Sequence, residues 1–510
     1  MKIFFIYPSA ESQLGFNYGV AHMASVLKQA GHQVRFWQLC EDIKPLPDEE
    51  EFIERIVSEK PDILAFSVVT NQWPYAQKLA SWAKKKLSIP FVIGGIHTLF
   101  NTHNILETGL FDYAFRGECE DAFPEFVEKL EQGKSVENVR NLALVNEGKI
   151  KINPVRPLPD LTKLPPKDYK SMDFQRTIDA KNGWVGLMAS RGCPFSCTYC
   201  FNHVMVKAYK DDLQCSFRQL NYIRRFSVDE VIKEIEYLQK NYRNIKMFIF
   251  DDDLFTFDKR YVQAFCKAYK KVSRIPFVIN AHVSFFDDEC SRALAEANCK
   301  IVKFGVESGS PKIRNRILNR HMSNEKIIEA IKTVADHGMH SSVFLIIGFP
   351  HEDRDDLFET IKLMAAAKPG RFRWTYFFPF PGTKSHQISF DGRYINSEKM
   401  EKLKNFTDES CLEFGPEHNL LLKKIGRIMP WFVNAFSDLS VSGFYAERIE
   451  EILALDEDQW TKVSPNIHAE DKKYSQRFSE KGQSHYAIKY NRFMGVISDY
   501  FLHDNDLSNK

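Results

Sequence analysis

The chain has 510 residues, of which 44% are hydrophobic and 27% are charged, and its net charge is +2. This is the composition of a globular protein of two or three domains. The near-neutral charge and the lack of a clustered basic stripe argue against a nucleic-acid binder. No apolar run approaches the roughly 20 residues of a membrane span, and the apolar start at residues 1–7 is too short for a signal peptide.

Residues 1–150 alternate short apolar runs with amphipathic helical stretches, which is the pattern of a parallel sheet. The predicted strands are 3–7, 34–37, 63–68, 91–93 and 112–115, with the last one closing the series. The predicted helices are 19–31, 49–58, 75–87 and one that starts near Asp121. The pattern predicts an N-terminal, doubly wound, Rossmann-like domain.

Small and polar residues follow three of these strands, where doubly wound sheets bind ligands. They are Ser67 and Thr70; Gly94, Gly95 and His97; and Gly117 and Glu118. Glycines there let a flat ligand approach the backbone, and the hydroxyls can bond to an amide edge. Each signal is weak alone, since a Gly-Gly pair is most often a tight turn. The first strand does not lead into a G-x-G-x-x-G stretch, which disfavours a dinucleotide site.

Residues 151–180 form a proline-rich linker, expected to be an extended connector that drapes over a surface. Its prolines are Pro154, Pro157, Pro159, Pro165 and Pro166.

Residues 181–390 resume the alternation of strands and helices. The predicted strands are 184–190, 245–251, 277–281, 301–306, 341–347 and 373–378. Ser227 and Glu230 predict a capping box at the start of one helix. Six strands in this order predict a partial (β/α)6 barrel related to the TIM barrel, with functional groups at the carboxyl ends of its strands.

Three cysteines, Cys193, Cys197 and Cys200, share a Cys-x3-Cys-x2-Cys spacing after the first of these strands. Such a loop can turn three thiolates toward one point, which suits an iron–sulfur cluster. Zinc is the alternative, but no second pair of ligands with zinc-like spacing lies nearby. A thioredoxin-like pair would need only the last two cysteines and leave the first unexplained. Free thiolates favour a reducing cytoplasm.

Other candidate residues follow the later strands of the predicted barrel. They are Asp252 and Asp253; Glu307, Ser308 and Gly309; and Gly348 and Pro350. The carboxylate of Glu307 could accept two hydrogen bonds from a ribose, and Arg320 could pair with a carboxylate. A capping turn is the alternative for the aspartates, and a solvated helix face is the alternative for Arg314 and Arg316.

Residues 391–510 are predicted to form a mostly helical domain that could hold a substrate pocket. We expect helices at 422–438 and 442–455, an irregular stretch at 460–485, a last helix over 486–501 and a disordered tail at 504–510. Pro430 should kink or divide the first helix. Five aromatic residues could line the pocket, although at helical spacing the core is the commoner place for them: Trp431, Phe432, Phe436, Phe444 and Tyr445.

The cysteine motif and the ordered strand-end motifs resemble those of the radical S-adenosylmethionine superfamily. In that resemblance Tyr199 is the aromatic before the last ligand, and Phe201 follows the ligand set. The first domain resembles the cobalamin-binding domain that precedes many of these barrels. Cobalamin domains of mutases carry Asp-x-His-x-x-Gly after the first strand, but this chain has Ser9-Ala10-Glu11-Ser12-Gln13-Leu14-Gly15 there. The lower face of a bound cobalamin would therefore lack a histidine ligand.

The resemblance implies a 4Fe–4S cluster held by the three cysteines, S-adenosylmethionine on the fourth iron, and cobalamin in the first domain. It implies a 5′-deoxyadenosyl radical and methylation of an unactivated carbon of a small molecule or natural product. An electron donor such as ferredoxin or flavodoxin is the expected partner. The alternatives are a ring-forming oxidation, as in the anaerobic porphyrin cyclases that the chain also resembles, a non-catalytic cobalamin- or cluster-binding redox sensor, and a zinc-stabilised protein.

Overall fold

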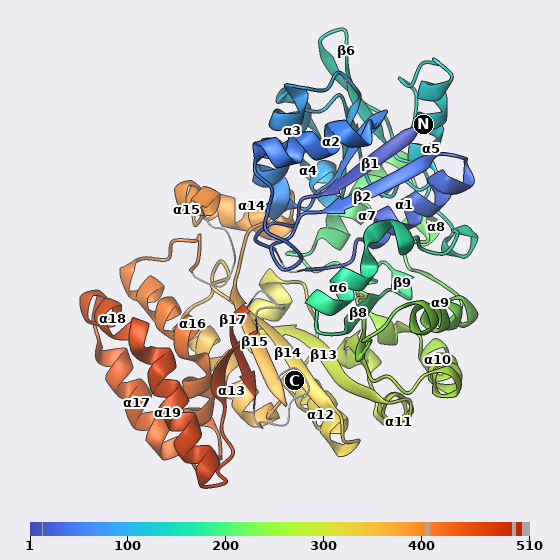
Figure 1. Cartoon of the computed structure of the whole chain (residues 1–510). Helices are drawn as coiled ribbons and strands as arrows, with labels where there is room; N and C mark the ends of the chain where they lie inside the picture. Colours follow the sequence, from blue (N-terminus) through green and yellow to red (C-terminus); the bar gives the residue numbers. More distant parts are fainter. Residues whose placement is uncertain (13, 403–408, 492–495, 502–510) are drawn as a thin grey trace. The chain divides into compact units, whose positions relative to one another are not determined.

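The protein folds into two compact units (Figure 1). The computed structural model describes residues 1–12, 14–402, 409–491 and 496–501. The first unit comprises residues 1–194 and 204–246, and the second comprises residues 195–203 and 247–510.

The first unit is built on a seven-stranded sheet with the order β2-β1-β3-β4-β5-β6-β7. The strands from β2 to β5 are parallel, and β6 and β7 are antiparallel. The strands are β1 (Lys2–Tyr7), β2 (Gln33–Gln38), β3 (Ile63–Ser67), β4 (Phe91–Gly94), β5 (Tyr113–Phe115), β6 (Leu142–Asn146) and β7 (Lys149–Ile152). The helices are α1 (Tyr18–Gln29), α2 (Glu49–Glu59), α3 (Trp73–Lys84), α4 (Ile96–Glu107) and α5 (Ala122–Glu131).

Alternate side chains of the sheet enter two separate apolar cores, one on each face. Phe5 packs with residues of α1 and α5, whereas its neighbour Phe4 packs with residues of α2, α3 and α4. Successive side chains of a strand point to opposite faces, so covering both faces needs helices on both sides. The predicted doubly wound, Rossmann-like architecture is confirmed.

The sequence prediction ended this sheet one hairpin too early. β6 and β7 extend it beyond β5, the strand that was expected to close the series. The two strands are joined by Glu147 and Gly148, both with positive φ (48° and 76°), which suits a tight two-residue hairpin turn.

The proline-rich linker lies along the first unit, and its carbonyl oxygens accept hydrogen bonds there. Asn141 N donates to Pro154 O (3.0 Å), and Ser25 Oγ of α1 donates to Pro166 O (2.5 Å). Proline carbonyls remain acceptors although proline lacks an N–H donor. The linker is thus held by its backbone and leads into α6 (Phe174–Ala180).

The elements around the cysteine loop follow. They are β8 (Trp184–Leu187), β9 (Ser190–Arg191), α7 (Phe201–Leu213), α8 (Phe217–Leu220), β10 (Arg224–Arg225) and α9 (Val228–Asn241). β8 is the strand expected before the cysteines. The predicted capping box of α9 is present, because Ser227 Oγ accepts from Glu230 N and the Glu230 carboxylate accepts from Ser227 N.

The second unit carries the parallel strands of the barrel in the order β11-β12-β13-β14-β15. The strands are β11 (Met247–Phe250), β12 (Phe277–Ala281), β13 (Cys299–Glu307), β14 (His340–Ile347) and β15 (Arg371–Tyr376). The alternating helices are α10 (Lys259–Val272), α11 (Asp288–Glu296), α12 (Asn324–Asp336) and α13 (Arg354–Ala367). This alternation confirms the partial barrel.

The C-terminal region is mostly helical, as expected. Its helices are α14 (Lys384–Asp391), α15 (Ser397–Lys402), α16 (Pro416–Phe436), α17 (Ser442–Ala454), α18 (Glu457–Val463) and α19 (Ile467–Glu480). The helical path of α16 is interrupted at Ile428 (φ −131°), two residues before Pro430, where the kink was expected. Trp431, Phe432 and Tyr445 are fully buried in the core, whereas Phe436 is exposed.

Two predictions for this region are wrong. The stretch 460–485 was expected to be irregular, but most of it lies in α18 and α19. The stretch 486–501 was expected to be helical, but it contains β16 (Ala487–Asn491) and β17 (Val496–Phe501). β17 pairs antiparallel with β15, and pairing with an open sheet edge overrides a local helical pattern. The tail 504–510 lies outside the described residues.

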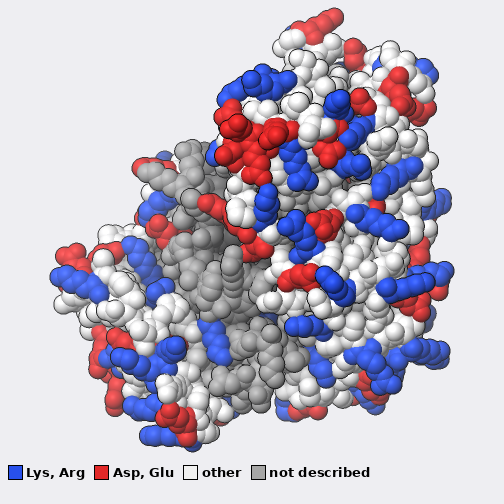
Figure 2. Space-filling model, in the orientation of Figure 1, with Lys and Arg blue, Asp and Glu red and all other residues white. Residues whose placement is uncertain are grey.

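Charges of both signs are interspersed over the face shown in Figure 2. In the described part of the chain, no helix is long and apolar enough to cross a bilayer.

Candidate functional site

The cysteine loop is divided between the two units. Cys193 belongs to the first unit, and Cys197 and Cys200 belong to the second. None of the ten cysteines of the chain forms a disulfide. Among the described residues, no three side chains of His, Cys, Asp or Glu stand in a metal-binding arrangement. The assignment of the three thiols as cluster ligands therefore rests on their spacing and their hydrogen-bonding environment.

The second arm of the loop, residues 195–203, is anchored by hydrogen bonds to the segment that follows β13. Thr198 N donates to Leu318 O (3.0 Å) and Thr198 Oγ1 donates to Ile317 O (2.6 Å). From α14, Ser385 N donates to Thr198 O (3.0 Å). Thr198 is therefore a fixed point between two cysteines, which the sequence analysis did not identify.

The two sulfurs in this arm each accept hydrogen bonds from nitrogen donors. Arg320 Nη1 lies 3.5 Å from Cys197 Sγ, and Asn202 N lies 3.5 Å from Cys200 Sγ. Hydrogen bonds to sulfur are typical of cluster thiolates and tune their potential. Burial, with a smaller contribution from the charge of Asp253, raises the pKa of Cys200 to about 11. Without a metal this thiol stays protonated, and the donor set fits a cluster that would hold it as a thiolate.

Glu307, Tyr199 and Arg320 meet at the carboxyl end of β13. Tyr199 Oη donates to Glu307 Oε1 (3.0 Å), and Arg320 Nε donates to Gly305 O (3.1 Å). Glu307 has φ +67°, an unusual backbone angle for a residue with a side chain. Burial raises the pKa of Glu307, while the charge of Arg320 and the Tyr199 hydroxyl act in the opposite direction. Three residues predicted to bind the cofactors thus come together beside Cys197.

Ser308 and Gly309 have a different environment from the one expected. Gly309 N donates to Thr360 Oγ1 of α13 (2.8 Å), and a Cβ on Gly309 would overlap the Thr360 backbone. Ser308 Oγ also lies 3.3 Å from Thr360 Oγ1. The glycine therefore permits close packing of a helix. Arg314 is fully buried and donates to Ser308 O (2.7 Å), so the solvated face expected for it is wrong, whereas Arg316 is exposed.

The turn after β14 is closed by a glutamate that the sequence analysis did not assign. Glu352 Oε2 accepts from Gly348 N (2.5 Å) and Phe349 N (3.2 Å), the two residues that precede Pro350 in this turn. Gly348 has φ +79°, where glycine is favoured. Burial raises the pKa of Glu352 to about 8. The sequence signal that could have identified Glu352 is its position four residues after Gly348, the glycine that directly follows β14.

The remaining predicted barrel residues lie around the same strand ends. Asp252 is buried and its carbonyl accepts from Asn280 Nδ2 (2.9 Å), whereas Asp253 is exposed. Phe201 starts α7, and its ring centroid lies 4.8 Å from that of Phe380.

In the first unit, the predicted ligand-binding residues after β3 and β4 lie at the ends of adjacent strands. Ser67 pairs in register with Gly94, and Ser67 Oγ accepts from Asn17 Nδ2 (2.9 Å). Thr70 begins a short 3-10 turn. Gly95 has φ +97°, and a Cβ there would lie 2.5 Å from Val68 O. Only glycine allows the two strand-end loops to touch.

His97 offers an unused polar atom at this edge of the sheet. Its ring stacks on Trp73 with centroids 5.0 Å apart, and Nδ1 pairs with Asn101 Nδ2 at 3.3 Å. Its Nε2 is buried without a hydrogen-bond partner among the described residues. Burial lowers the pKa of His97 to about 4, so the ring is neutral. A neutral imidazole with a spare nitrogen fits a ligand rich in amides, such as cobalamin.

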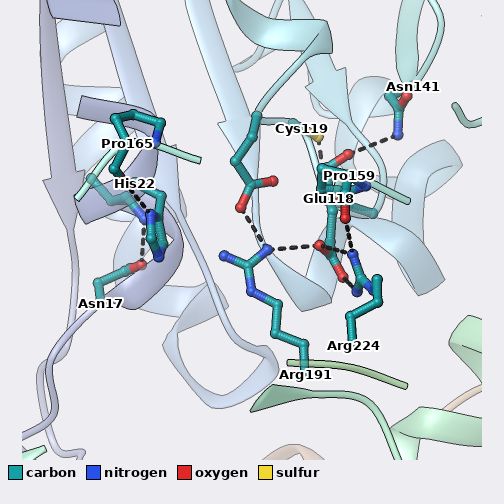
Figure 3. Close-up of polar contacts among 12 residues, drawn as sticks. Asn17, His22, Glu118, Cys119, Asn141, Pro159, Pro165, Arg191 and Arg224 are labelled. Atoms are coloured by element: carbon teal, nitrogen blue, oxygen red, sulfur yellow. Dashed lines mark hydrogen bonds and ion pairs between the residues drawn. The ribbon is translucent and has the colours of Figure 1, made fainter. Parts of the chain in front are cut away.

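Gly117 and Glu118, after β5, are held by the chain that leads into and out of the cysteine loop. Figure 3 shows Glu118 between Arg191 and Arg224. Arg191 Nη1 donates to Glu118 Oε2 (2.7 Å), and Arg224 donates to both carboxylate oxygens. Tyr209 Oη leaves no room for a side chain at Gly117. The Glu118 carboxylate thus serves an ion-pair cluster, while the backbone of this loop remains the predicted cofactor contact.

Comparison with protein-family models gives two matches. The B12 binding domain model matches residues 12–127, and the radical SAM superfamily model matches residues 187–364. The two matches correspond to the Rossmann-like sheet and to the barrel with its cysteine loop.

Relatives from other organisms match most of the chain. An "uncharacterized methyltransferase" of Pyrococcus horikoshii is 30% identical over 432 residues, which are 80% of this chain and 89% of the relative. The anaerobic magnesium-protoporphyrin IX monomethyl ester cyclase of Rubrivivax gelatinosus is 26% identical over 75% of this chain and 68% of its own. The cytidylyl-2-hydroxyethylphosphonate methyltransferase of Streptomyces wedmorensis is 24% identical over 65% of this chain and 68% of its own.

Two solved structures share the fold. The radical S-adenosylmethionine methyltransferase TsrM of Kitasatospora setae superposes with a TM-score of 0.62 at 14% identity, over 76% of each chain. The cobalamin-dependent S-adenosylmethionine radical enzyme OxsB gives a TM-score of 0.60 at 18% identity, over 79% of this chain and 56% of its own. Because both domain models match and a relative is 30% identical over 80% of the chain, the chain belongs to the cobalamin-binding radical S-adenosylmethionine enzymes, whose cofactors are a 4Fe–4S cluster, S-adenosylmethionine and cobalamin.

Proposed function

We propose that this enzyme transfers a methyl group to an unactivated carbon of a small molecule. The observation that carries the proposal is the meeting of Tyr199, Glu307 and Arg320 beside Cys197, at the end of β13. The similarity to the Pyrococcus horikoshii methyltransferase over 80% of the chain supports methyl transfer.

When bound, the cluster with S-adenosylmethionine supplies a carbon-centred radical, and cobalamin supplies the methyl group. Cys193, Cys197 and Cys200 would hold the cluster, and the remaining donors of Arg320 would bind the carboxylate of S-adenosylmethionine. Glu307 would accept hydrogen bonds from the ribose hydroxyls, with its Oε1 oriented by Tyr199. In the first unit, His97 Nε2 and the backbone of Gly94, Gly95 and Gly117 would contact cobalamin.

Burial at this site serves the chemistry by keeping water away from reactive species. Cys197 is 4% exposed and Glu307 is 8% exposed. Arg320 is oriented by the carbonyl of Gly305 before any ligand arrives, which reduces the ordering cost of binding. A reduced ferredoxin or flavodoxin is the proposed electron donor.

Ring-forming oxidation is the second candidate, because the chain is 26% identical over 401 residues to the Rubrivivax gelatinosus cyclase. The two reactions differ in the mass of the product. Methylation adds one methylene, whereas cyclisation removes hydrogen or adds oxygen.

The test uses the full chain, purified anaerobically and reconstituted with iron, sulfide and hydroxocobalamin. Iron, sulfide and corrinoid are quantified, and the enzyme is then incubated with dithionite, S-adenosylmethionine carrying a deuterated methyl group, and a small-molecule extract of the host cell. We expect 5′-deoxyadenosine, S-adenosylhomocysteine and a product with a deuterated methyl group. Cys197→Ala is the control and should yield none of them.

The other outcomes separate the alternatives. Loss of hydrogen or gain of oxygen without a deuterated methyl group favours the cyclase. Corrinoid and cluster without 5′-deoxyadenosine favour a redox sensor. A colourless protein that binds zinc and no iron overturns the proposal.

A further inference from the structure

A buried cluster of four charged side chains joins the loop after β5 to the start of the cysteine loop, within the first unit (Figure 3). Arg191 Nη1 lies 2.7 Å from Glu118 Oε2 and 2.6 Å from Glu120 Oε1, and Arg224 binds both oxygens of Glu118. The cluster contains two arginines and two glutamates, so its net charge is zero. The four side chains are 4–14% exposed, so solvent screens them weakly.

The cluster brings together residues of the two family matches. Glu118 and Glu120 lie in the B12-binding match, residues 12–127, whereas Arg191 and Arg224 lie in the radical SAM match, residues 187–364. The ion pairs are therefore a direct link between the cobalamin-binding module and the chain segment that carries the cluster ligands.

On the cysteine side, the link is short and stiff. Arg191 of β9 pairs in register with Arg224 of β10, and Cys193 follows two residues later. Between them, Gly192 has φ +92° and packs so closely on Tyr222 O that no Cβ would fit. Gly192 thus joins Arg191 to Cys193 by a backbone that is itself held in place.

On the cobalamin side, the loop is held along its backbone. Glu118 N donates to Tyr209 Oη (2.7 Å), and Asn141 Nδ2 donates to Arg116 O (2.7 Å). Arg116 also pairs with Asp212 of α7 at 3.2 Å. The loop cannot move without disturbing buried charges, and moving Glu118 alone would leave two arginines uncompensated.

We propose that this ion-pair cluster couples the two cofactors. Arg191 is a positioning residue that transmits occupancy of the cobalamin module to Cys193. Binding of cobalamin then shifts the reduction potential of the 4Fe–4S cluster. By linkage, the oxidation state of the 4Fe–4S cluster changes the affinity for cobalamin by the same factor. This inference goes beyond methyl transfer, because it does not depend on the acceptor.

The test is a redox titration of the anaerobically reconstituted full chain, followed by electron paramagnetic resonance, with and without hydroxocobalamin. For the wild type we expect a shift of about three- to tenfold in the reduction equilibrium, ~30–59 mV for a one-electron couple. In Glu120→Gln and Arg191→Gln the titrations with and without hydroxocobalamin should coincide. Glu120 is the sharper choice, since it is not among the predicted cobalamin contacts.

A matched control is available in the same unit. Lys167 and Glu234 form a comparably buried pair at 2.7 Å that ties the linker to α9 and does not include the cysteine loop. Glu234→Gln should lose stability but keep the cobalamin-dependent shift, which separates coupling from folding. Three results overturn the proposal: no shift in the wild type, a full shift in Glu120→Gln, or loss of the shift in Glu234→Gln as well. If Arg191→Gln does not fold, the Glu120→Gln titration decides by the same criteria.

Discussion

Buried glutamates have opposite environments in the two units. Glu118 in the first unit is paired with Arg191 and Arg224, whereas Glu352 in the second accepts from the backbone amides of Gly348 and Phe349. Burial alone would raise the pKa of Glu118, but the charges of the arginines outweigh it and hold the pKa below the usual range. Among the described residues no cation offsets the burial of Glu352, and its pKa rises to about 8. Glu118 is therefore ionised and Glu352 is protonated at neutral pH. Raising the pH favours the ionised form that Glu118 has in the folded protein and disfavours the protonated form of Glu352.

The strongest way to break this comparison is Glu118→Ala. Both arginines would keep buried charges without a carboxylate, and breaking a buried pair costs about 3–5 kcal/mol in the free energy of unfolding. Urea denaturation measures the loss. The exposed pair Asp229–Lys233 gives the control, and Asp229→Ala should leave the midpoint unchanged. Equal midpoints for Glu118→Ala and the wild type would contradict the assigned role of the pair.

Arg320→Lys tests the cation beside Glu307. A lysine keeps the charge but loses the fork that reaches Gly305 O and Cys197 Sγ together. Charge-assisted hydrogen bonds contribute about 1.5–3 kcal/mol, so we expect affinity for S-adenosylmethionine to fall roughly 10- to 150-fold. Anaerobic titration calorimetry measures it. Arg316→Lys, on an exposed neighbour, is the matched control, and equal affinities for both variants would refute the prediction.

Glu352→Gln sharpens the comparison through pH. The folded acid keeps its proton up to about pH 8, whereas the unfolded acid releases it near its ordinary pKa of about 4.3. The folded state therefore binds more protons, and stability falls as pH rises from the lower pKa to the higher. The slope is about 1.4 kcal/mol per pH unit at most. Urea midpoints at pH 6 and pH 7 should differ less in the variant than in the wild type, and parallel changes would show that Glu352 is ionised.

The smallest effect is expected at Thr198. The part of the cysteine loop around Thr198 is held by neutral hydrogen bonds, whereas the part before Cys193 is held by the ion pairs of Arg191. Thr198→Val keeps the shape but removes both the donor to Ile317 O and the acceptor for Ser385 Oγ, at a cost of about 1 kcal/mol for each bond. Thermal denaturation, together with iron retention after gel filtration, reports it. Thr461→Val, which removes an exposed bond to Glu457 O, should have less effect. A loss of stability as large as that of Glu118→Ala would contradict the prediction that ion pairs hold the part before Cys193 more strongly than hydrogen bonds hold the part around Thr198.

Much of the fold could be predicted from local patterns in the sequence. The alternation of apolar runs predicted the strands of both sheets, and the capping box at Ser227 was read from four residues. The cysteine spacing and the residues after β13 likewise pointed to the site. These features depend on neighbours within a few positions in the chain.

Long-range partners could not be read in the same way. The hydroxyl that meets Gly309 comes from Thr360, 51 residues later, and the acid that meets Arg191 comes from Glu118, 73 residues earlier. The strands β16 and β17 were mistaken for a helix because what decides their state is pairing with the edge at β15. Helical and strand patterns overlap in short apolar stretches, and only the neighbour resolves them.

Because the two units are interleaved along the chain, the first unit cannot be completed until residue 246 has been synthesised. The chain leaves the first unit after residue 194, returns at residue 204 and leaves it again after residue 246. Glu118 must therefore wait 106 residues for Arg224 to emerge. At a ribosomal rate of 5–20 residues per second, this delay is about 5–20 s. During that interval the nascent sheet carries an acidic loop without its basic partners.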